Sequence, residues 1–288
     1  MTTRRRLMSL ILGGVVGLPL VGCAGGLPTE VGATRIKLAS FNIWHNLGDW
    51  AARRPLLIEA LRAQDADIIA LQEVLEDAAV GLENQAQMLA RELGDYRVAF
   101  VSTDQEGAGR RYGNALLTRL PVVAEERVLL EPLSDYRTAL RLRVLKDGQP
   151  VDVVVTHLAW QPDAGAVRAQ QIAHLLSWLP RDGKPVVIAG DFNAPLDDDG
   201  LAALTGPRFV SALAAGAVPT TLNPAKGHKE RVIDHIFVEA GQLNPIEAHI
   251  FGTKAQDGEY PSDHFGVATQ VELRPFRAGL KGRTDGEP

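Results

Sequence analysis

The strongest constraint on the fold is a series of short apolar runs, rich in Val and Ile, that recur along most of the chain. Runs of this length and composition predict β-strands. They cover residues 36–41, 68–71, 96–101, 115–118, 138–144, 151–156, 186–189, 233–238 and 266–273. Segments with apolar residues at helical spacing lie between them, at residues 55–63, 85–93 and 168–179. Strands mixed with a few helices predict one α+β domain of two layered sheets over residues 35–274.

The first residues of the chain differ from this pattern. Three arginines, Arg4 to Arg6, precede an uncharged apolar run that reaches Leu20-Val21-Gly22-Cys23. This arrangement predicts a signal peptide over residues 1–22, and the run is short for a permanent membrane span. Its end resembles the bacterial lipobox, which implies that Cys23 is lipidated, anchors the protein in a lipid bilayer and becomes the first mature residue. A cleaved signal with an incidental cysteine is the alternative.

A location outside the cytoplasm follows from these features. Residues 23–34 would be the lipidated cysteine and its tether, and residues 275–288 would be a C-terminal tail. We expect an exported lipoprotein, periplasmic or at the cell surface, anchored to a bacterial membrane. The export route stays open between twin-arginine and general secretory, and so does the membrane leaflet. Because Cys23 is the only cysteine, disulfide-stabilised folds are excluded.

The charge balance limits the partners of the protein. Removal of residues 1–22 takes away three of the 30 Lys and Arg residues and none of the 35 Asp and Glu residues, which leaves a net charge of about −8. A protein that coats nucleic acid without sequence preference needs a basic surface to neutralise phosphates. We therefore expect no avid non-specific nucleic-acid binding, and we expect a monomer.

Polar side chains follow the predicted strands at the points where the strands end. An amide, a carboxylate and an imidazole end three of the runs, at Asn42, Glu73 and His157. Asp191 and Asn193 follow another run, and extended geometry would turn both toward the same side. Gly190 between the run and Asp191 would let the backbone approach a neighbour closely. Further along the chain, Asp234-His235 and Asp263-His264 each pair an aspartate with a histidine.

In this order the motifs strongly resemble the endonuclease/exonuclease/phosphatase superfamily of metal-dependent phosphoesterases, in particular its deoxyribonuclease and abasic-endonuclease group. The matching residues are Phe41-Asn42, Leu71-Gln72-Glu73, Gly113-Asn114-Ala115, Thr156-His157-Leu158, Gly190-Asp191-Phe192-Asn193, Ile233-Asp234 and Ser262-Asp263-His264. The resemblance spans about residues 35 to 274. It implies a four-layer α/β/β/α sandwich, in which helices flank two packed mixed β-sheets and the active site lies at one end of the sheets.

The residues at this end are suited to a hard divalent cation. Asn42, Glu73 and Asp263 are oxygen donors of the kind that bind Mg²⁺ or Mn²⁺, and the chain has no cysteine cluster for zinc. Asp191 and Asn193 offer further oxygen donors or water anchors. Whether one or two metal ions act stays open.

Several catalytic roles are implied by the resemblance. His264 would accept a proton from the attacking water, and Asp234 would orient its imidazole. His157 and Asn193 would contact the phosphate, while Asp191 would position or activate the nucleophile. Asn114 would support the site from a neighbouring strand. Strand parity opposes His235 to Asp234, so His235 is interpreted as structural.

The substrate is left open by the sequence. The loops at residues 103–112 and 215–231 would border the cleft, and Arg111 and Arg231 are candidate contacts for an anionic substrate. We expect a phosphodiester hydrolase for nucleic acid, a nucleotide or a phospholipid-type substrate. A phosphomonoesterase for inositol or sugar phosphates and a non-catalytic binding lipoprotein are the alternatives. The abasic-endonuclease pattern has a tyrosine where this chain has Thr156-His157-Leu158-Ala159-Trp160, which argues against DNA repair.

Overall fold

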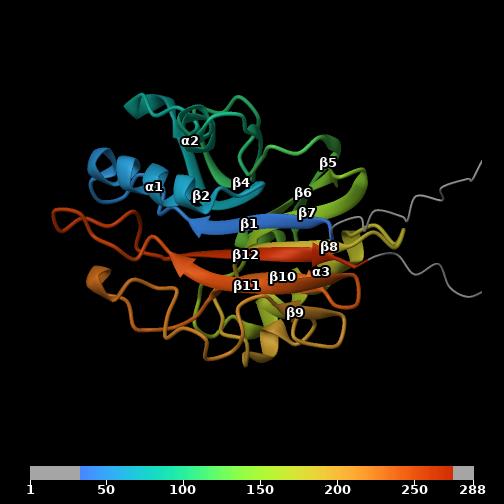
Figure 1. The fold of residues 1–288 in the computed structure, drawn as a ribbon. Helices are drawn as coiled ribbons and strands as arrows, with labels where there is room; N and C mark the ends of the chain where they lie inside the picture. Colours follow the sequence, from blue (N-terminus) through green and yellow to red (C-terminus); the bar gives the residue numbers. More distant parts are fainter. Residues whose placement is uncertain (1–32, 275–288) are drawn as a thin grey trace, which may run out of the picture. The chain divides into compact units, whose positions relative to one another are not determined.

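Two six-stranded mixed sheets form the centre of the computed structural model, which describes residues 33–274 (Figure 1). Sheet A has the strand order β11–β12–β1–β2–β4–β3. Its strands are β1 (Arg35–Asn42), β2 (Ile68–Asp77), β3 (Arg97–Ser102), β4 (Arg110–Thr118), β11 (Leu243–Phe251) and β12 (Gly266–Leu273). Sheet B has the order β5–β6–β7–β8–β10–β9. Its strands are β5 (Val122–Leu130), β6 (Arg137–Lys146), β7 (Gln149–His157), β8 (Val186–Asp191), β9 (Phe209–Ser211) and β10 (Asp234–Glu239).

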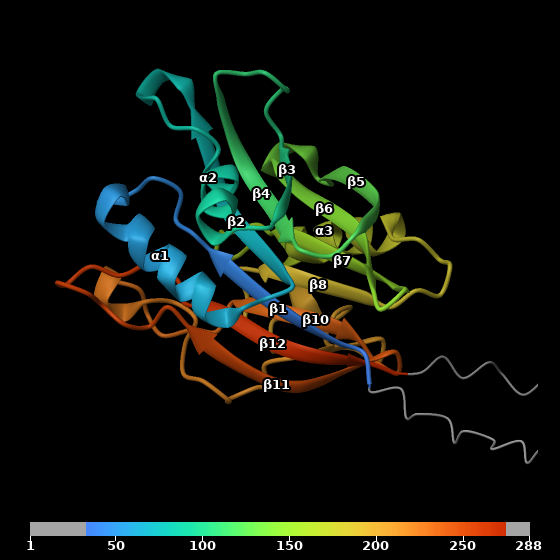
Figure 2. The ribbon, with the colours of Figure 1, turned by 45° about the horizontal axis from the view of Figure 1, so that its top comes forward.

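Helices cover the outer face of each sheet (Figure 2). Helices α1 (Trp50–Gln64) and α2 (Gln85–Leu93) pack on sheet A through an apolar cluster that includes Leu57 and Leu89. Helix α3 (Gly165–Trp178) packs on sheet B through a second cluster that includes Ile172 and Leu175. A third cluster fills the space between the sheets. The predicted four-layer α/β/β/α sandwich is therefore confirmed.

Strand alternation explains the three apolar clusters. On β1, Leu38 faces the other sheet, whereas Ala39 and Phe41 face the helices. On β7, Val153 and Val155 likewise belong to the cluster between the sheets. Each sheet is apolar on both faces, and its central strands are accordingly continuous apolar runs in the sequence.

Two parallel strand pairs determine where the chain places its polar residues. Strand β1 runs parallel to β2 with α1 as the connection, and β7 runs parallel to β8 with α3 as the connection. The remaining strand pairs are antiparallel. Parallel strands end at the same edge of a sheet. The polar motifs that follow these four strands are thereby brought to one edge of each sheet.

The sequence missed β5, β9 and β11, which are all edge strands. Edge strands have one unpaired side, and β5 and β11 consist mostly of partly or fully exposed residues instead of forming apolar runs. Single-turn 3₁₀ helices also cover Ala78–Val80, Leu133–Asp135, Asp199–Leu201 and Pro224–Lys226. Within residues 33–274, the helices are too short or too polar to cross a membrane. Cys23, the predicted signal peptide and most of the predicted tether and tail lie outside the described residues.

Candidate active site

The site is formed by side chains at the strand ends that point, like the apolar cluster, into the space between the two sheets. On β7 and β8 the apolar residues that face the opposite sheet are followed, two positions on, by His157 and Asp191, and on β1 Asn42 follows Leu38 by four positions, with the buried Ser40 between them. Asp191 pairs with His157 on β7 and with Asp234 on β10. The cluster between the sheets is thus apolar along its length and polar at this one end.

Glu73 stands at a break in sheet A. The register between β2 and β4 shifts between Leu71 and Val74, and Glu73 has a left-handed backbone with φ of 60°. Such a backbone is unfavourable for a residue with a side chain, and it is typical of positions held for function. Burial raises the pKa of Glu73, and the nearby Asp263 carboxylate acts in the same direction. Glu73 is therefore a carboxylate that lacks sufficient compensating positive charge.

Asn42 lies between two carboxylates. Its side-chain Nδ2 donates to Oε1 of Glu73 at 3.1 Å and to Oδ2 of Asp191 at 3.0 Å. Its Oδ1 accepts the backbone N–H of Trp44 at 3.0 Å. The amide oxygen has a second lone pair, so the role of Asn42 as a metal ligand stays a prediction. In this structure the amide nitrogen of Asn42 joins the two carboxylates.

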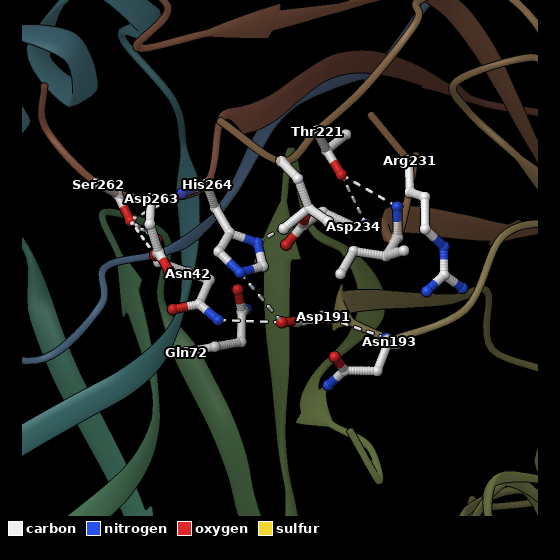
Figure 3. A network of polar contacts seen from close by, with 12 residues as sticks. Asn42, Gln72, Asp191, Asn193, Thr221, Arg231, Asp234, Ser262, Asp263 and His264 are labelled. Atoms are coloured by element: carbon white, nitrogen blue, oxygen red, sulfur yellow. Dashed lines mark hydrogen bonds and ion pairs between the residues drawn. The ribbon is translucent and has the colours of Figure 1, made fainter. Parts of the chain in front are cut away.

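His264 lies between Asp234 and Asp191 (Figure 3). Its Nδ1 is 2.9 Å from Oδ2 of Asp234, and its Nε2 is 3.8 Å from Oδ2 of Asp191. All three side chains are buried. Burial alone would lower the pKa of His264, but the carboxylates of Asp234, Asp191 and Asp263 together outweigh it, and the pKa rises well above its usual value. Burial raises the pKa of Asp234 to about 6.

His157 and Asn193 approach Asp191 from the other side. His157 Nε2 is 3.5 Å from Oδ2 of Asp191, and burial lowers the pKa of His157 to about 3, so this imidazole is neutral. The backbone N–H of Asn193 donates to Oδ1 of Asp191 at 2.8 Å. The extended geometry predicted for Asn193 is wrong, because β8 ends at Asp191 and Asn193 has φ of 53°. The side chain lines the pocket nevertheless.

Gly190 is required by a close strand contact. A Cβ atom at this position would lie 2.0 Å from the carbonyl oxygen of Thr156 on β7. No side chain fits at that distance, so the predicted close approach is confirmed. The glycine lets β7 and β8 bring His157 and Asp191 into register.

Asp263 has a partner that the sequence did not reveal. Nε2 of His228 is 3.0 Å from Oδ2 of Asp263, and the His228 ring centroid lies 6.3 Å from that of His264. His228 follows no strand motif and belongs to the long loop at residues 215–231, which was predicted to border the cleft. In the sequence, the charged loop that contains His228 was the one indication that this histidine lies near the site.

Strand parity corrects the predicted substrate contacts. Arg111 points to the helix side of β4, where it pairs with Glu76 at 3.2 Å and lies over the ring of Phe100. Its neighbours Arg110 and Tyr112 have the opposite parity and line the pocket. Arg231 is exposed and is not among the pocket-lining residues.

Asn114 and His235 are buried outside the pocket lining. Asn114 is buried, and its Nδ2 donates to Oγ1 of Thr138 at 3.1 Å, so it joins β4 to β6 behind the pocket. His235 faces away from the site, with its Nε2 2.9 Å from the carbonyl oxygen of Ala194, and its pKa is lowered to about 4 by burial. This location agrees with its interpretation as structural.

The site opens into a pocket of about 580 Å³. Six of the predicted site residues line it, and Asn42 and Asp234 contact the lining from behind. The lining residues are Glu73, Thr103, Asp104, Arg110, Tyr112, Asp135, Tyr136, Arg137, His157, Trp160, Asp191, Asn193, His228, Asp263 and His264. The sequence analysis gave no role to Tyr112, Tyr136 or Trp160, because none of them is a polar residue at the end of an apolar run.

The donor set fits a divalent cation. Carboxylates of Glu73, Asp191, Asp234 and Asp263 are collected at this end of the sandwich. Ligand atoms of Asp191, Asp234 and His264 lie within 4.8 Å of one another. The two nitrogens of His264 each face one of these carboxylates, which is an arrangement for proton transfer. Glu73 and Asp263, the predicted carboxylate ligands of Mg²⁺ or Mn²⁺, line the same pocket.

Comparison with known proteins places these residues in a family. The sequence profile of the endonuclease/exonuclease/phosphatase family matches residues 39–264. The chain is also similar to "Uncharacterized protein YbhP" of Escherichia coli (strain K12), with 30% identity over 183 residues that cover 58% of this chain and 70% of that protein.

Solved structures share the fold. The human Nocturnin catalytic domain with bound sulfate is 23% identical, with a TM-score of 0.68, and the match covers 83% of this chain and 95% of that chain. The endonuclease/exonuclease/phosphatase from Bacteroides vulgatus is 22% identical, with a TM-score of 0.69 and coverage of 84% and 100%. D. rerio TDP2 complexed with a single-strand DNA product is 21% identical, with a TM-score of 0.68 and coverage of 82% and 98%.

Proposed function

The chain belongs to the endonuclease/exonuclease/phosphatase family of metal-dependent phosphoric ester hydrolases, and we propose that it hydrolyses a phosphodiester outside the cytoplasm. The observation that carries this proposal is the buried row Asp234–His264–Asp191, which ends in a pocket that also contains Glu73. A carboxylate, an imidazole and a second carboxylate in line can accept a proton from water and stabilise the charge that results.

Proton transfer follows from the two nitrogens of the imidazole. Nδ1–H of His264 donates to Asp234, which leaves Nε2 facing the pocket and Asp191. In this tautomer Nε2 can accept a proton from a water molecule that Asp191 orients. Asp234 then stabilises the imidazolium that forms.

The other wall of the pocket suits the phosphate. His157 is neutral because its pKa is lowered, and a neutral imidazole can donate a hydrogen bond to a phosphoryl oxygen. Because it carries no positive charge, it does not form an ion pair with the nearby carboxylates. Asn193 is held by a hydrogen bond from its Nδ2 to the carbonyl oxygen of Leu158 at 3.1 Å, so the amide is already oriented. Held by Glu73 and Asp263, a divalent cation would polarise a phosphoryl oxygen and offset its growing negative charge.

A substrate panel tests the activity. The protein is assayed with Mg²⁺ or Mn²⁺ on bis(4-nitrophenyl) phosphate, 4-nitrophenyl phosphate, RNA, plasmid DNA, sphingomyelin and inositol phosphates. We expect cleavage of diesters that depends on the metal and is abolished by a chelator. Exclusive cleavage of monoesters would replace the proposal with a phosphatase, and no cleavage of any member would favour a binding protein.

The cellular location is a separate part of the proposal. It is supported by the Leu20-Val21-Gly22-Cys23 motif and the arginines before it. In a bacterial host, the full chain should fractionate with membranes and incorporate labelled fatty acid. Cys23→Ser should abolish both the membrane fractionation and the labelling. Cys23 is the only cysteine, so no other thiol can carry the lipid. Equal labelling of Cys23→Ser would overturn the lipid anchor.

A further inference from the structure

Two exposed aromatic rings lie at the mouth of the catalytic pocket. Tyr136 is 75% exposed and Trp160 is 64% exposed, and both line the pocket that contains His264. Among the exposed large hydrophobic residues within residues 33–274, these two are the aromatic ones. Neither ring takes part in an aromatic pair or a cation–π contact in the described part of the chain. Their flat faces therefore stay free for a partner.

Trp160 is exposed although its loop is firmly held. Nη1 of the buried Arg168 donates to the carbonyl oxygens of Ala159 at 3.2 Å and Gln161 at 3.0 Å, on either side of the tryptophan. The backbone N–H of Ala159 donates to Oε1 of Gln171 at 3.0 Å. The loop therefore has its backbone fixed from helix α3 while its one large side chain is left in solvent.

The same glutamine also holds the loop of Tyr136. Nε2 of Gln171 donates to Oδ2 of Asp135 at 2.6 Å, and Gln171 is fully buried. Tyr136 itself has a left-handed backbone with φ of 54°, an unfavourable conformation for a bulky residue. One buried amide thus couples the two loops, and the position of both rings is set before any ligand arrives.

We propose that Tyr136 and Trp160 bind an unpaired nucleobase of the substrate by stacking, so that the preferred diester is that of a nucleotide or a single-stranded nucleic acid. The proposal rests on the proposed phosphodiesterase function and names its substrate class. Rings fixed in advance lose little entropy on binding, and aromatic stacking accepts any base. Arg110 and Arg137 line the same pocket and suit the neighbouring phosphates.

A lipid bilayer is the weaker partner for these rings. The same pocket is lined by the exposed carboxylate of Asp104. Insertion of the rings into a membrane would bring this acidic group against the lipid, which is unfavourable. A base that stacks at the pocket mouth leaves it in water.

Two esters with the same leaving group separate base binding from chemistry. We compare kcat/KM for thymidine 5′-(4-nitrophenyl) phosphate with that for methyl 4-nitrophenyl phosphate, and the ratio reports the contribution of the nucleoside. Trp160→Ala and Tyr136→Ala should each lower this ratio about 5- to 100-fold, mainly through KM of the thymidine ester. Trp160→Phe should restore most of the ratio because it keeps a ring.

Val123→Ala, exposed and outside the pocket lining, is the control and should keep the wild-type ratio. Loss of activity on both esters to the same extent would overturn the proposal.

A binding measurement without turnover makes the two proposals distinguishable. Adenosine monophosphate added in the presence of a chelator should quench tryptophan fluorescence in the wild type, and the quenching should disappear in Trp160→Phe. If neither ester is cleaved but the quenching occurs, the phosphodiesterase proposal fails and the base site stands. An absence of quenching, together with a blue shift of Trp160 emission on phosphatidylcholine vesicles, would overturn the base site in favour of a lipid contact.

Discussion

The crossovers β1–α1–β2 and β7–α3–β8 both place a buried arginine at the fourth position of the helix, Arg53 in α1 and Arg168 in α3. In each, the guanidinium donates to backbone carbonyls of the loop that leaves the first strand. Arg53 Nη2 reaches the carbonyl oxygens of Trp44 and His45, as Arg168 reaches those beside Trp160. In both crossovers, therefore, a buried helix arginine fixes the backbone of a loop at the active site.

The two arginines differ in what else they bind. Arg53 donates only to carbonyls, five in all, and one belongs to Pro261, just before Ser262-Asp263-His264. Burial lowers its pKa to about 10. Arg168 has a carboxylate partner, with its Nη2 3.0 Å from Oδ2 of Asp198. Arg53 therefore connects two separate segments of the site, whereas Arg168 holds one loop.

The chemistry at the strand ends differs as well. The first crossover brings Asn42 and Glu73 together, with Nδ2 of Asn42 3.1 Å from Oε1 of Glu73. The second brings His157 and Asp191 together, with Nε2 of His157 3.5 Å from Oδ2 of Asp191. In the proposed function the first pair belongs to metal binding and the second to phosphate contact and proton transfer.

The largest expected effect separates metal binding from proton transfer. Asp191→Asn should lower kcat about 10²- to 10⁴-fold at every Mg²⁺ concentration, because it removes the carboxylate that faces both imidazoles. Glu73→Gln should fold normally and regain activity as Mg²⁺ is raised. Titration of kcat/KM against Mg²⁺ measures both. Wild-type activity of Glu73→Gln at limiting Mg²⁺ would remove Glu73 from the metal site.

The next effect compares the two arginines in stability. Arg53→Met leaves five carbonyls without their donor and should lower the free energy of unfolding by about 3–4 kcal/mol. Arg168→Met should lower it by about 2–3 kcal/mol, because water can reach the partly exposed Asp198. Urea unfolding measures both, with the exposed Arg127→Met as control, which should stay within about 0.5 kcal/mol. The reverse order would show that Arg53 does not join the two segments.

A smaller effect concerns pH. As a base, His264 must be unprotonated, so kcat/KM should rise with pH through a pKa above the usual imidazole value. Asp234 is the strongest influence that raises this pKa, so Asp234→Asn should move the rise to lower pH, even though the maximal rate falls. Profiles of kcat/KM between pH 5 and pH 9 check this. A shift to higher pH in Asp234→Asn would contradict the pairing.

The sequence predicted the two sheets and their polar ends because both follow from local patterns. Continuous apolar runs mark central strands, and a polar residue two positions beyond a core-facing residue stays on the same side, as Asp191 does after Ala189. Asn42 and His157 were found as polar residues at the ends of apolar runs, and Asp234 was found as part of an Asp-His pair.

The remaining features depend on contacts between distant segments. Glu73 was predicted as a carboxylate at a strand end, but β2 continues to Asp77 and shifts register around Glu73, and no pattern in residues 71–74 indicates that shift. His228 meets Asp263 because a long loop folds back on the site. Arg110 was passed over for Arg111 because the run at residues 115–118 did not show that β4 begins at Arg110, and so its parity could not be extended.

The smallest expected effect compares the tryptophans of the two loops. Trp44 is partly buried, with the Arg53 guanidinium 4.9 Å and the Lys226 Nζ 5.5 Å from its ring centroids, whereas Trp160 is 64% exposed. Trp44→Leu should therefore lower the free energy of unfolding by about 1–2 kcal/mol, through lost packing and cation–π attraction. Trp160→Leu should change it by less than about 0.5 kcal/mol, as expected for an exposed residue. Urea unfolding of both variants measures the difference. A cost for Trp160→Leu as large as that for Trp44→Leu would show that its ring packs against the protein in solution, and the second loop would then present no free ring at the pocket.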